Sequence, residues 1–173
     1  MTSGIVIVDG GYFKNHSFCQ IKRGENIEQI RPTEVKEYGF ANGITYVSFN
    51  LGTNNLPHYY FLERLSRGKF NVYYLKYSGS KRRYFIQNKD SVNLIEIQHD
   101  KREYSNLLRK ELTDCPESIS NISLFRLRKT DVKRFFDDYN SCTKHLIPIY
   151  QYGILSGGQL IRFTSTSIGD KAY

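Results

Sequence analysis

At 173 residues, the chain is close to the usual size of one domain. Hydrophobic residues make up 39% of it and charged residues 24%, and apolar side chains recur along its whole length, which excludes a disordered chain. The net charge of +8 favours a polyanionic partner, of which nucleic acid is the most common in a cell. No apolar run reaches the ~18 residues of a membrane span, so we expect no membrane helix.

The three cysteines, Cys19, Cys115 and Cys142, are far apart and include no CxxC pair. Sequence neighbours therefore build neither a zinc ribbon nor a redox dithiol. We expect reduced, partly buried thiols and, with them, a cytoplasmic location.

The first predicted elements are two strands and a helix. Residues 4–9 predict a strand whose run Ile5–Val8 is continuously apolar, which is typical of a central strand of a parallel sheet, and residues 44–50 predict a second strand. Asn54 or Asn55 fits the N-cap of a helix that ends at Gly68, with Pro57 in its first turn. The helical spacing then puts three apolar residues on one face: Tyr60, Phe61 and Leu65.

The middle of the chain predicts a β-hairpin. Residues 69–77 and 81–87 are rich in aromatic and β-branched residues and flank the turn Ser78-Gly79-Ser80. Residues 92–98 predict one more strand, and 100–113 predict a helix that begins at Asp100.

The last third of the chain predicts strands around one helix. Residues 121–128 have the composition of a strand, and Thr130 or Asp131 fits the cap of a helix through Tyr139. A final hairpin is expected from residues 146–152 and 159–165, where Pro148 favours an edge strand. We therefore expect one domain over residues 1–173, of the α/β or α+β class. Its mixed sheet would contain hairpins and carry about three to four covering helices.

The segment Gly4–Phe13 carries the clearest chemical motif. An apolar strand delivers Asp9 to its C-terminal end, and Gly10 and Gly11 let the backbone turn tightly. Ligands of α/β proteins bind at such strand ends, and a carboxylate there suits Mg²⁺ or Mn²⁺. The structural alternative is a turn aspartate that accepts hydrogen bonds from nearby amides.

This segment resembles the first strand of the PIN-like nucleases, particularly their NYN branch. The resemblance implies that Asp9 is a catalytic, metal-binding residue of a Mg²⁺- or Mn²⁺-dependent ribonuclease acting on single-stranded RNA, or the remnant of one in an inactive relative. The metal would act as Lewis acid and water activator. The only clustered later aspartates are Asp131, Asp137 and Asp138, which lie on a predicted helix.

The predicted hairpin interleaves basic and aromatic residues, a mixture that binds single-stranded RNA or DNA through phosphates and stacked bases. The alternative is that the rings pack the sheet while the charges keep it soluble. Two arginines of the predicted strand 121–128 extend the positive field. The candidate nucleic-acid-binding residues are Lys76, Tyr77, Lys81, Arg82, Arg83, Tyr84, Arg126 and Arg128.

Two other functions compete with nucleic-acid binding. A non-enzymatic interaction or inhibitor protein, of the phage or mobile-element type, would bind an acidic partner protein through the same basic surface. A small-molecule enzyme would use Glu96 and His99, with Asp100 beside them, although Asp100 is also explained as a helix cap.

Overall fold

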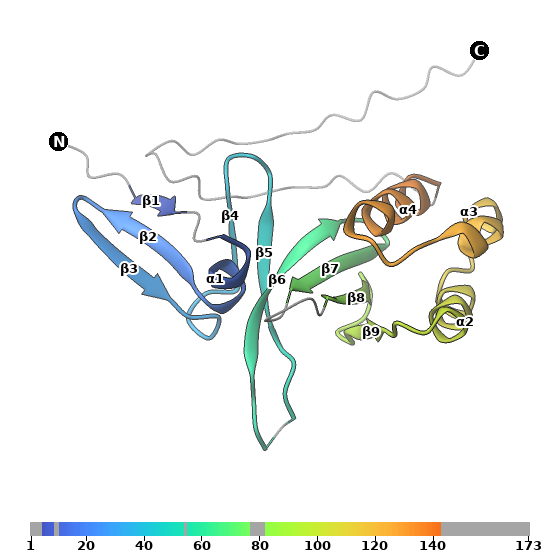
Figure 1. The fold of residues 1–173 in the computed structure, drawn as a ribbon, viewed down its shortest axis with the longest axis horizontal. Helices are drawn as coiled ribbons and strands as arrows, with labels where there is room; N and C mark the ends of the chain where they lie inside the picture. Colours follow the sequence, from blue (N-terminus) through green and yellow to red (C-terminus); the bar gives the residue numbers. More distant parts are fainter. Residues whose placement is uncertain (1–4, 9–10, 54, 77–81, 143–173) are drawn as a thin grey trace, which may run out of the picture.

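The computed structural model of residues 1–173 describes residues 5–8, 11–53, 55–76 and 82–142. It shows a mixed α+β fold, as the sequence predicts, in which the strands form two antiparallel sheets (Figure 1) rather than one mixed sheet. The smaller sheet has the strand order β1 (Ile5–Val8), β2 (Cys19–Arg23) and β3 (Asn26–Ile30). The larger sheet is a meander, in which each strand pairs with the next along the chain: β4 (Glu37–Gly39), β5 (Thr45–Asn50), β6 (Tyr59–Ser66), β7 (Phe70–Lys76), β8 (Arg82–Asn88) and β9 (Ile95–Ile97).

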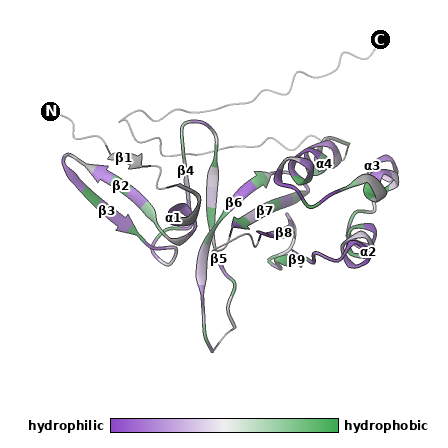
Figure 2. Cartoon of the chain, viewed as in Figure 1, coloured by the Kyte–Doolittle hydropathy of each residue, from purple (hydrophilic) through white to green (hydrophobic). Residues whose placement is uncertain are grey.

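The helices lie in two places (Figure 1): the first stands between the two sheets, and the others gather at one end of the larger sheet, beside β7–β9. Figure 2 shows α2 mostly in the colour of hydrophilic residues. This composition suits a helix of which only the inward side, with Tyr104 and Leu108, is buried. The helical elements are α1 (Gly11–Ser17), α2 (Lys101–Glu111), α3 (Pro116–Ser120), the 3₁₀ turn η1 (Asn121–Leu124) and α4 (Lys129–Cys142).

Three groups of buried side chains hold the described residues together. The main core lies between one face of the larger sheet and the helices α2 to α4, and includes Val72, Ile86 and Phe136. A second group, with Tyr38 and Phe61, lies near α1 and β2. A third covers the opposite face of the larger sheet: Leu62, Tyr73, Leu75 and Phe85. Both faces of the central strands are therefore apolar.

The predicted hairpin and the two long helices are confirmed. β7 and β8 pair antiparallel, from Phe70 opposite Asn88 to Lys76 opposite Arg82. The carboxylate of Asp100 caps α2 by accepting hydrogen bonds from the backbone amides of Arg102 (2.9 Å) and Glu103 (3.0 Å). The predicted strands at 44–50 and 92–98 are also present, as β5 and β9.

The helix predicted between Asn54 and Gly68 is wrong, because the strand β6, Tyr59–Ser66, occupies most of this range. Side chains alternate along β6, so that Phe61 and Leu65 face one side of the sheet and Leu62 the other. All three are buried, and a run buried on both faces shows no helical or strand periodicity from which to choose. Aromatic residues favour the strand.

Two other predicted strands differ from the structure. The first strand, β1, pairs antiparallel with β2 and is the end strand of its sheet among the described strands, whereas the sequence predicts a central parallel strand. Residues 121–128 contain no strand; η1 and a loop take their place, with Ile122 and Phe125 buried three positions apart as on a helical turn. The hairpin β2–β3, unpredicted by sequence, turns at Gly24, whose φ of 62° favours glycine.

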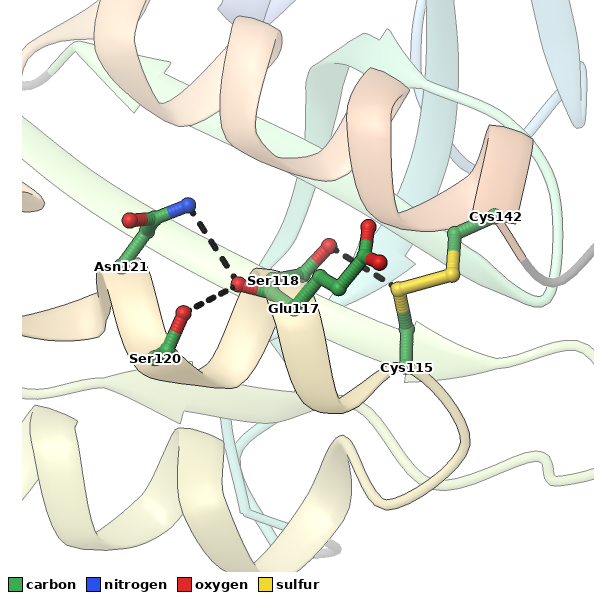
Figure 3. The surroundings of a disulfide bond; sticks show 6 residues. All are labelled: Cys115, Glu117, Ser118, Ser120, Asn121 and Cys142. Atoms are coloured by element: carbon green, nitrogen blue, oxygen red, sulfur yellow. Dashed lines mark hydrogen bonds between the residues drawn. A yellow bond between two sulfur atoms is a disulfide. The ribbon is translucent and has the colours of Figure 1, made fainter.

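The prediction of reduced thiols is wrong for two of the three cysteines. Cys115, just before α3, and Cys142, at the end of α4, form a disulfide (Figure 3), while Cys19 is free and buried. The cytoplasmic location was expected because the thiols were expected to be reduced. The disulfide removes this argument, because disulfides persist mainly in oxidising compartments. None of the described helices is long and apolar enough to cross a membrane. The hairpin predicted over 146–165 lies outside the described residues.

Candidate nucleic-acid interface

A row of side chains crosses the face of the larger sheet on which α4 packs. The register places Glu63 of β6 opposite Tyr74 of β7, and Tyr74 opposite Tyr84 of β8. Directly opposed residues of antiparallel strands point to the same face, so these three side chains are neighbours. Lys129, the first residue of α4, crosses this row: its Nζ lies 2.6 Å from Glu63 Oε1 and 5.4 Å from the centre of the Tyr74 ring.

Basic residues from three segments meet where α4 begins. Lys76 and Arg82 are directly opposed and lie two residues beyond Tyr74 and Tyr84, so they continue the same face to the end of the sheet. Arg128 precedes Lys129, and its amide donates to the Arg126 carbonyl (2.8 Å). Because Glu63 neutralises Lys129, we call the other four residues the basic cluster: Lys76, Arg82, Arg126 and Arg128. Arg82, Arg126 and Arg128 are exposed to solvent.

Tyr84 belongs to the core, although it was predicted to contact nucleic acid. Its relative exposure is 0%, and its ring packs against that of Tyr74. Burial raises the pKa of its hydroxyl to about 12; the nearby Tyr74 hydroxyl adds to the rise, while the charge of Arg82 opposes it. A ring in this position offers no face to a base, so we remove Tyr84 from the candidate site.

Arg83 lies on the opposite face of the sheet from the basic cluster. Its guanidinium forms a two-pronged pair with Glu96 of β9, at 2.7 Å from Nε to Oε1 and 2.6 Å from Nη2 to Oε2. It also lies over the Phe85 ring, 5.0 Å from its centre. Since Glu96 already neutralises this charge, we do not count Arg83 as a phosphate contact.

The remaining predicted site residues are Asp9, Tyr77 and Lys81, which lie outside the described residues. The ribonuclease function and the Mg²⁺ or Mn²⁺ site, which depend on Asp9, stay predictions. Within the described ranges, no group of three or more His, Cys, Asp or Glu side chains is placed to hold a metal ion.

Glu96, His99 and Asp100 each bond a different structural partner. Glu96 pairs with Arg83, and Asp100 caps α2. A ring nitrogen of His99 donates to the backbone carbonyl of Arg82 at 2.5 Å. Each side chain thus has a structural partner of its own.

His16 of α1 is a buried residue that the sequence did not single out. Its Nδ1–H donates to the Phe61 carbonyl (2.6 Å), and its Nε2 accepts from the Lys76 amide (3.3 Å). These two bonds define a neutral imidazole with the proton on Nδ1. The partners lie 45 and 60 residues away, so no local pattern could have indicated this role.

We expect His16 to make stability depend on pH. Burial lowers the pKa of His16 below its ordinary 6.5; the bond to Phe61 raises it in part, and the Lys129 charge lowers it again. Because the folded state holds the neutral ring, the stabilisation is complete above pH 6.5 and is lost as the pH falls from there to the folded pKa. The urea midpoint of the wild type should fall between about pH 7.5 and 5.5, and that of His16→Gln should fall less. Equal pH dependence of the two proteins would contradict this role.

No match was found among protein-family models, curated proteins or solved structures.

Proposed function

We propose that this protein binds nucleic acid through phosphate contacts made by the basic cluster. The observation that carries the proposal is the convergence of basic residues from β7, β8 and the loop before α4 at one end of the sheet. The N-terminus of α4 adds the positive end of its helix dipole to this field. A net charge of +8 attracts a polyanion to the molecule at long range.

The affinity should depend more on the phosphate charges of the nucleic acid than on stacking of its bases against aromatic side chains. The aromatic side chains of the described parts of β7 and β8 are buried: Phe70, Tyr73, Tyr74, Tyr84 and Phe85. Phosphate contacts position a nucleic acid without reading its sequence. Single-stranded RNA and single-stranded DNA of equal length should therefore bind with similar affinity.

The triple variant Arg82→Ala/Arg126→Ala/Arg128→Ala tests this site. All three side chains are exposed, so their removal should leave the fold intact. Affinity for a labelled single strand should fall roughly tenfold or more near 0.1 M salt, and the slope of log K against log[salt] should shrink by about 0.7 to 0.9 for each lost contact. Fluorescence anisotropy titrations at several salt concentrations measure both quantities.

A matched control removes the same charge elsewhere. Lys22, Arg31 and Lys36 are also exposed; Lys22 lies on β2, Arg31 follows β3, and Lys36 precedes β4 at the opposite end of the larger sheet from β9. Their triple alanine variant should bind more tightly than the Arg82/Arg126/Arg128 variant. Equal losses in both variants would mean that net charge alone attracts the nucleic acid. If the wild type does not bind at all, an acidic partner protein becomes the better explanation of the basic surface.

Incubating the same labelled single-stranded nucleic acid with the protein and Mg²⁺ or Mn²⁺ tests whether the chain is a nuclease, as its resemblance to PIN-like nucleases implies. Cleavage that chelation stops, and that Asp9→Asn abolishes, would extend the proposal from binding to hydrolysis. Binding without cleavage would support an inactive relative.

A further inference from the structure

The loop that joins β5 to β6 carries apolar side chains into solvent. We call residues 50–53 and 55–59 the β5–β6 tip. Leu56 is 64% exposed and Tyr59 43% exposed, and Pro57 between them is exposed as well. Figure 1 shows the tip at the end of a long hairpin that projects from the body of the molecule. Leu51, at the base of the tip, packs against the cluster on the larger sheet, whereas Leu56, Pro57 and Tyr59 stay exposed.

The tip belongs to an uncharged stretch of an otherwise charged protein. From Tyr38 to Leu62 the sequence contains no Lys, Arg, Asp or Glu, although these residues make up 24% of the chain. Proteins that bind single-stranded nucleic acid interleave cations with rings, which this stretch does not. The centres of protein–protein interfaces, in contrast, are depleted of charge and enriched in aromatic residues.

The tip is held in one shape by its own hydrogen bonds. Asn50 Oδ1 accepts from the amides of Gly52 (3.0 Å) and His58 (2.9 Å), and the Leu51 amide donates to the His58 carbonyl (2.8 Å). At Gly52 the backbone passes so closely that an added Cβ would lie 2.1 Å from the Leu56 carbonyl oxygen. A preorganised loop loses little conformational entropy when it binds.

Charge indicates which partner fits this surface. Two copies of a chain with a net charge of +8 repel each other wherever their basic surfaces approach. The Tyr38–Leu62 stretch lets two copies meet without bringing like charges together. In a two-fold dimer the same patch contacts itself, and an apolar, uncharged tip is complementary to its own copy.

We propose that the β5–β6 tip is a self-association surface, through which two copies of this chain pair by burying Leu56, Pro57 and Tyr59. The pairing is a separate property from nucleic-acid binding and responds to salt in the opposite direction. Salt screens the repulsion between the two basic copies and strengthens the dimer, whereas it weakens phosphate contacts.

Sedimentation velocity and light scattering on the full chain test this inference. The mass of the wild type should rise from 20.2 kDa toward twice that value with concentration, and the dimer dissociation constant should fall as salt is raised. Leu56→Ser/Tyr59→Ser should weaken dimerisation by at least roughly tenfold, because each copy loses its apolar contacts. Val92→Ser is the matched control, since Val92 is 91% exposed in a different loop, and it should dimerise like the wild type.

A second variant keeps the apolar side chains and removes the preorganisation. Asn50→Ala deletes the acceptor that bonds the Gly52 and His58 amides, and it should also weaken the dimer. A wild type that remains monomeric at all concentrations and salts would overturn the inference, and so would equal losses in the tip variant and Val92→Ser. If the tip variant kept its dimer but lost affinity for RNA, the tip would be a base-stacking element instead.

Discussion

Replacing Asn140 by alanine should cost about 3 to 5 kcal/mol of unfolding free energy, a large part of the 5 to 15 kcal/mol typical of a domain. Asn140 lies on α4 and is 8% exposed. Its Nδ2 donates to the Phe70 carbonyl (2.9 Å) and to Ser66 Oγ (3.0 Å), and its Oδ1 accepts from the Phe70 amide (3.0 Å). Alanine removes the partner of the Phe70 amide and of the Phe70 carbonyl, and each buried group that loses its partner costs about 1 to 3 kcal/mol.

The turn between β6 and β7 is shaped around this side chain. A Cβ at Gly68 would lie 2.5 Å from Asn140 Cγ, so the glycine lets the turn close over the amide. Ser66 Oγ in addition donates to Asp137 Oδ1 (2.6 Å), which gives α4 a second attachment to the same turn. Asn140 and Asp137 therefore both join α4 to the β6–β7 turn, and Asn140 makes the more buried of the two links.

Urea denaturation followed by circular dichroism measures this loss. Asn106→Ala on α2 is the matched control, because Asn106 is exposed. The unfolding free energy of this variant should stay within about 0.5 kcal/mol of that of the wild type. Asn140→Asp keeps an acceptor for the Phe70 amide but loses both donors, so it should also be strongly destabilised. If the unfolding free energy of Asn140→Ala were within about 1 kcal/mol of that of the wild type, water would be replacing the Asn140 side chain at little cost in stability.

Reducing the disulfide should destabilise the protein by about 3 to 4 kcal/mol, the chain-entropy value for a loop of this length. Cys115 and Cys142 are 27 residues apart, and their bond ties the start of α3 to the end of α4 (Figure 3). Cys115 is 1% exposed and its Sγ also lies 3.2 Å from Ser118 Oγ. A thiol count under denaturing, non-reducing conditions should find one free thiol per chain.

That free thiol is Cys19, which should not exchange with the disulfide in the folded state. Burial raises the pKa of Cys19 to about 11, so the reactive thiolate is scarce at neutral pH. The urea midpoint of the wild type should fall when dithiothreitol is added, and that of Cys115→Ser/Cys142→Ser should not change. Three free thiols in the denatured wild type would contradict the pairing.

The elements that sequence predicted correctly are those with local signals. Asp100 caps α2 through amides two and three residues away, and the β7–β8 hairpin has aromatic strands of matching length. β6 was missed because Pro57 and the preceding asparagines fit a helix start, while the burial of both faces of the strand depends on distant elements.

The candidate site was predicted in part for the same reason. Exposed cations such as Arg82, Arg126 and Arg128 could be named from composition. The burial of Tyr84 could not, because alternation does not say how many faces of a strand are covered. The contact of Lys129 with Glu63 joins residues on α4 and β6, which only the fold brings together.

The meander order of the larger sheet has a consequence for how the chain reaches its native state. Since β4 to β9 pair in the order in which they are synthesised, each hairpin needs only a short loop to close, and short-range contacts form fast. The attachments of α4 span about 70 residues and so carry the largest loop-closure entropy. Docking of this helix is therefore expected to come late in folding and to limit its rate, with the sheet already assembled.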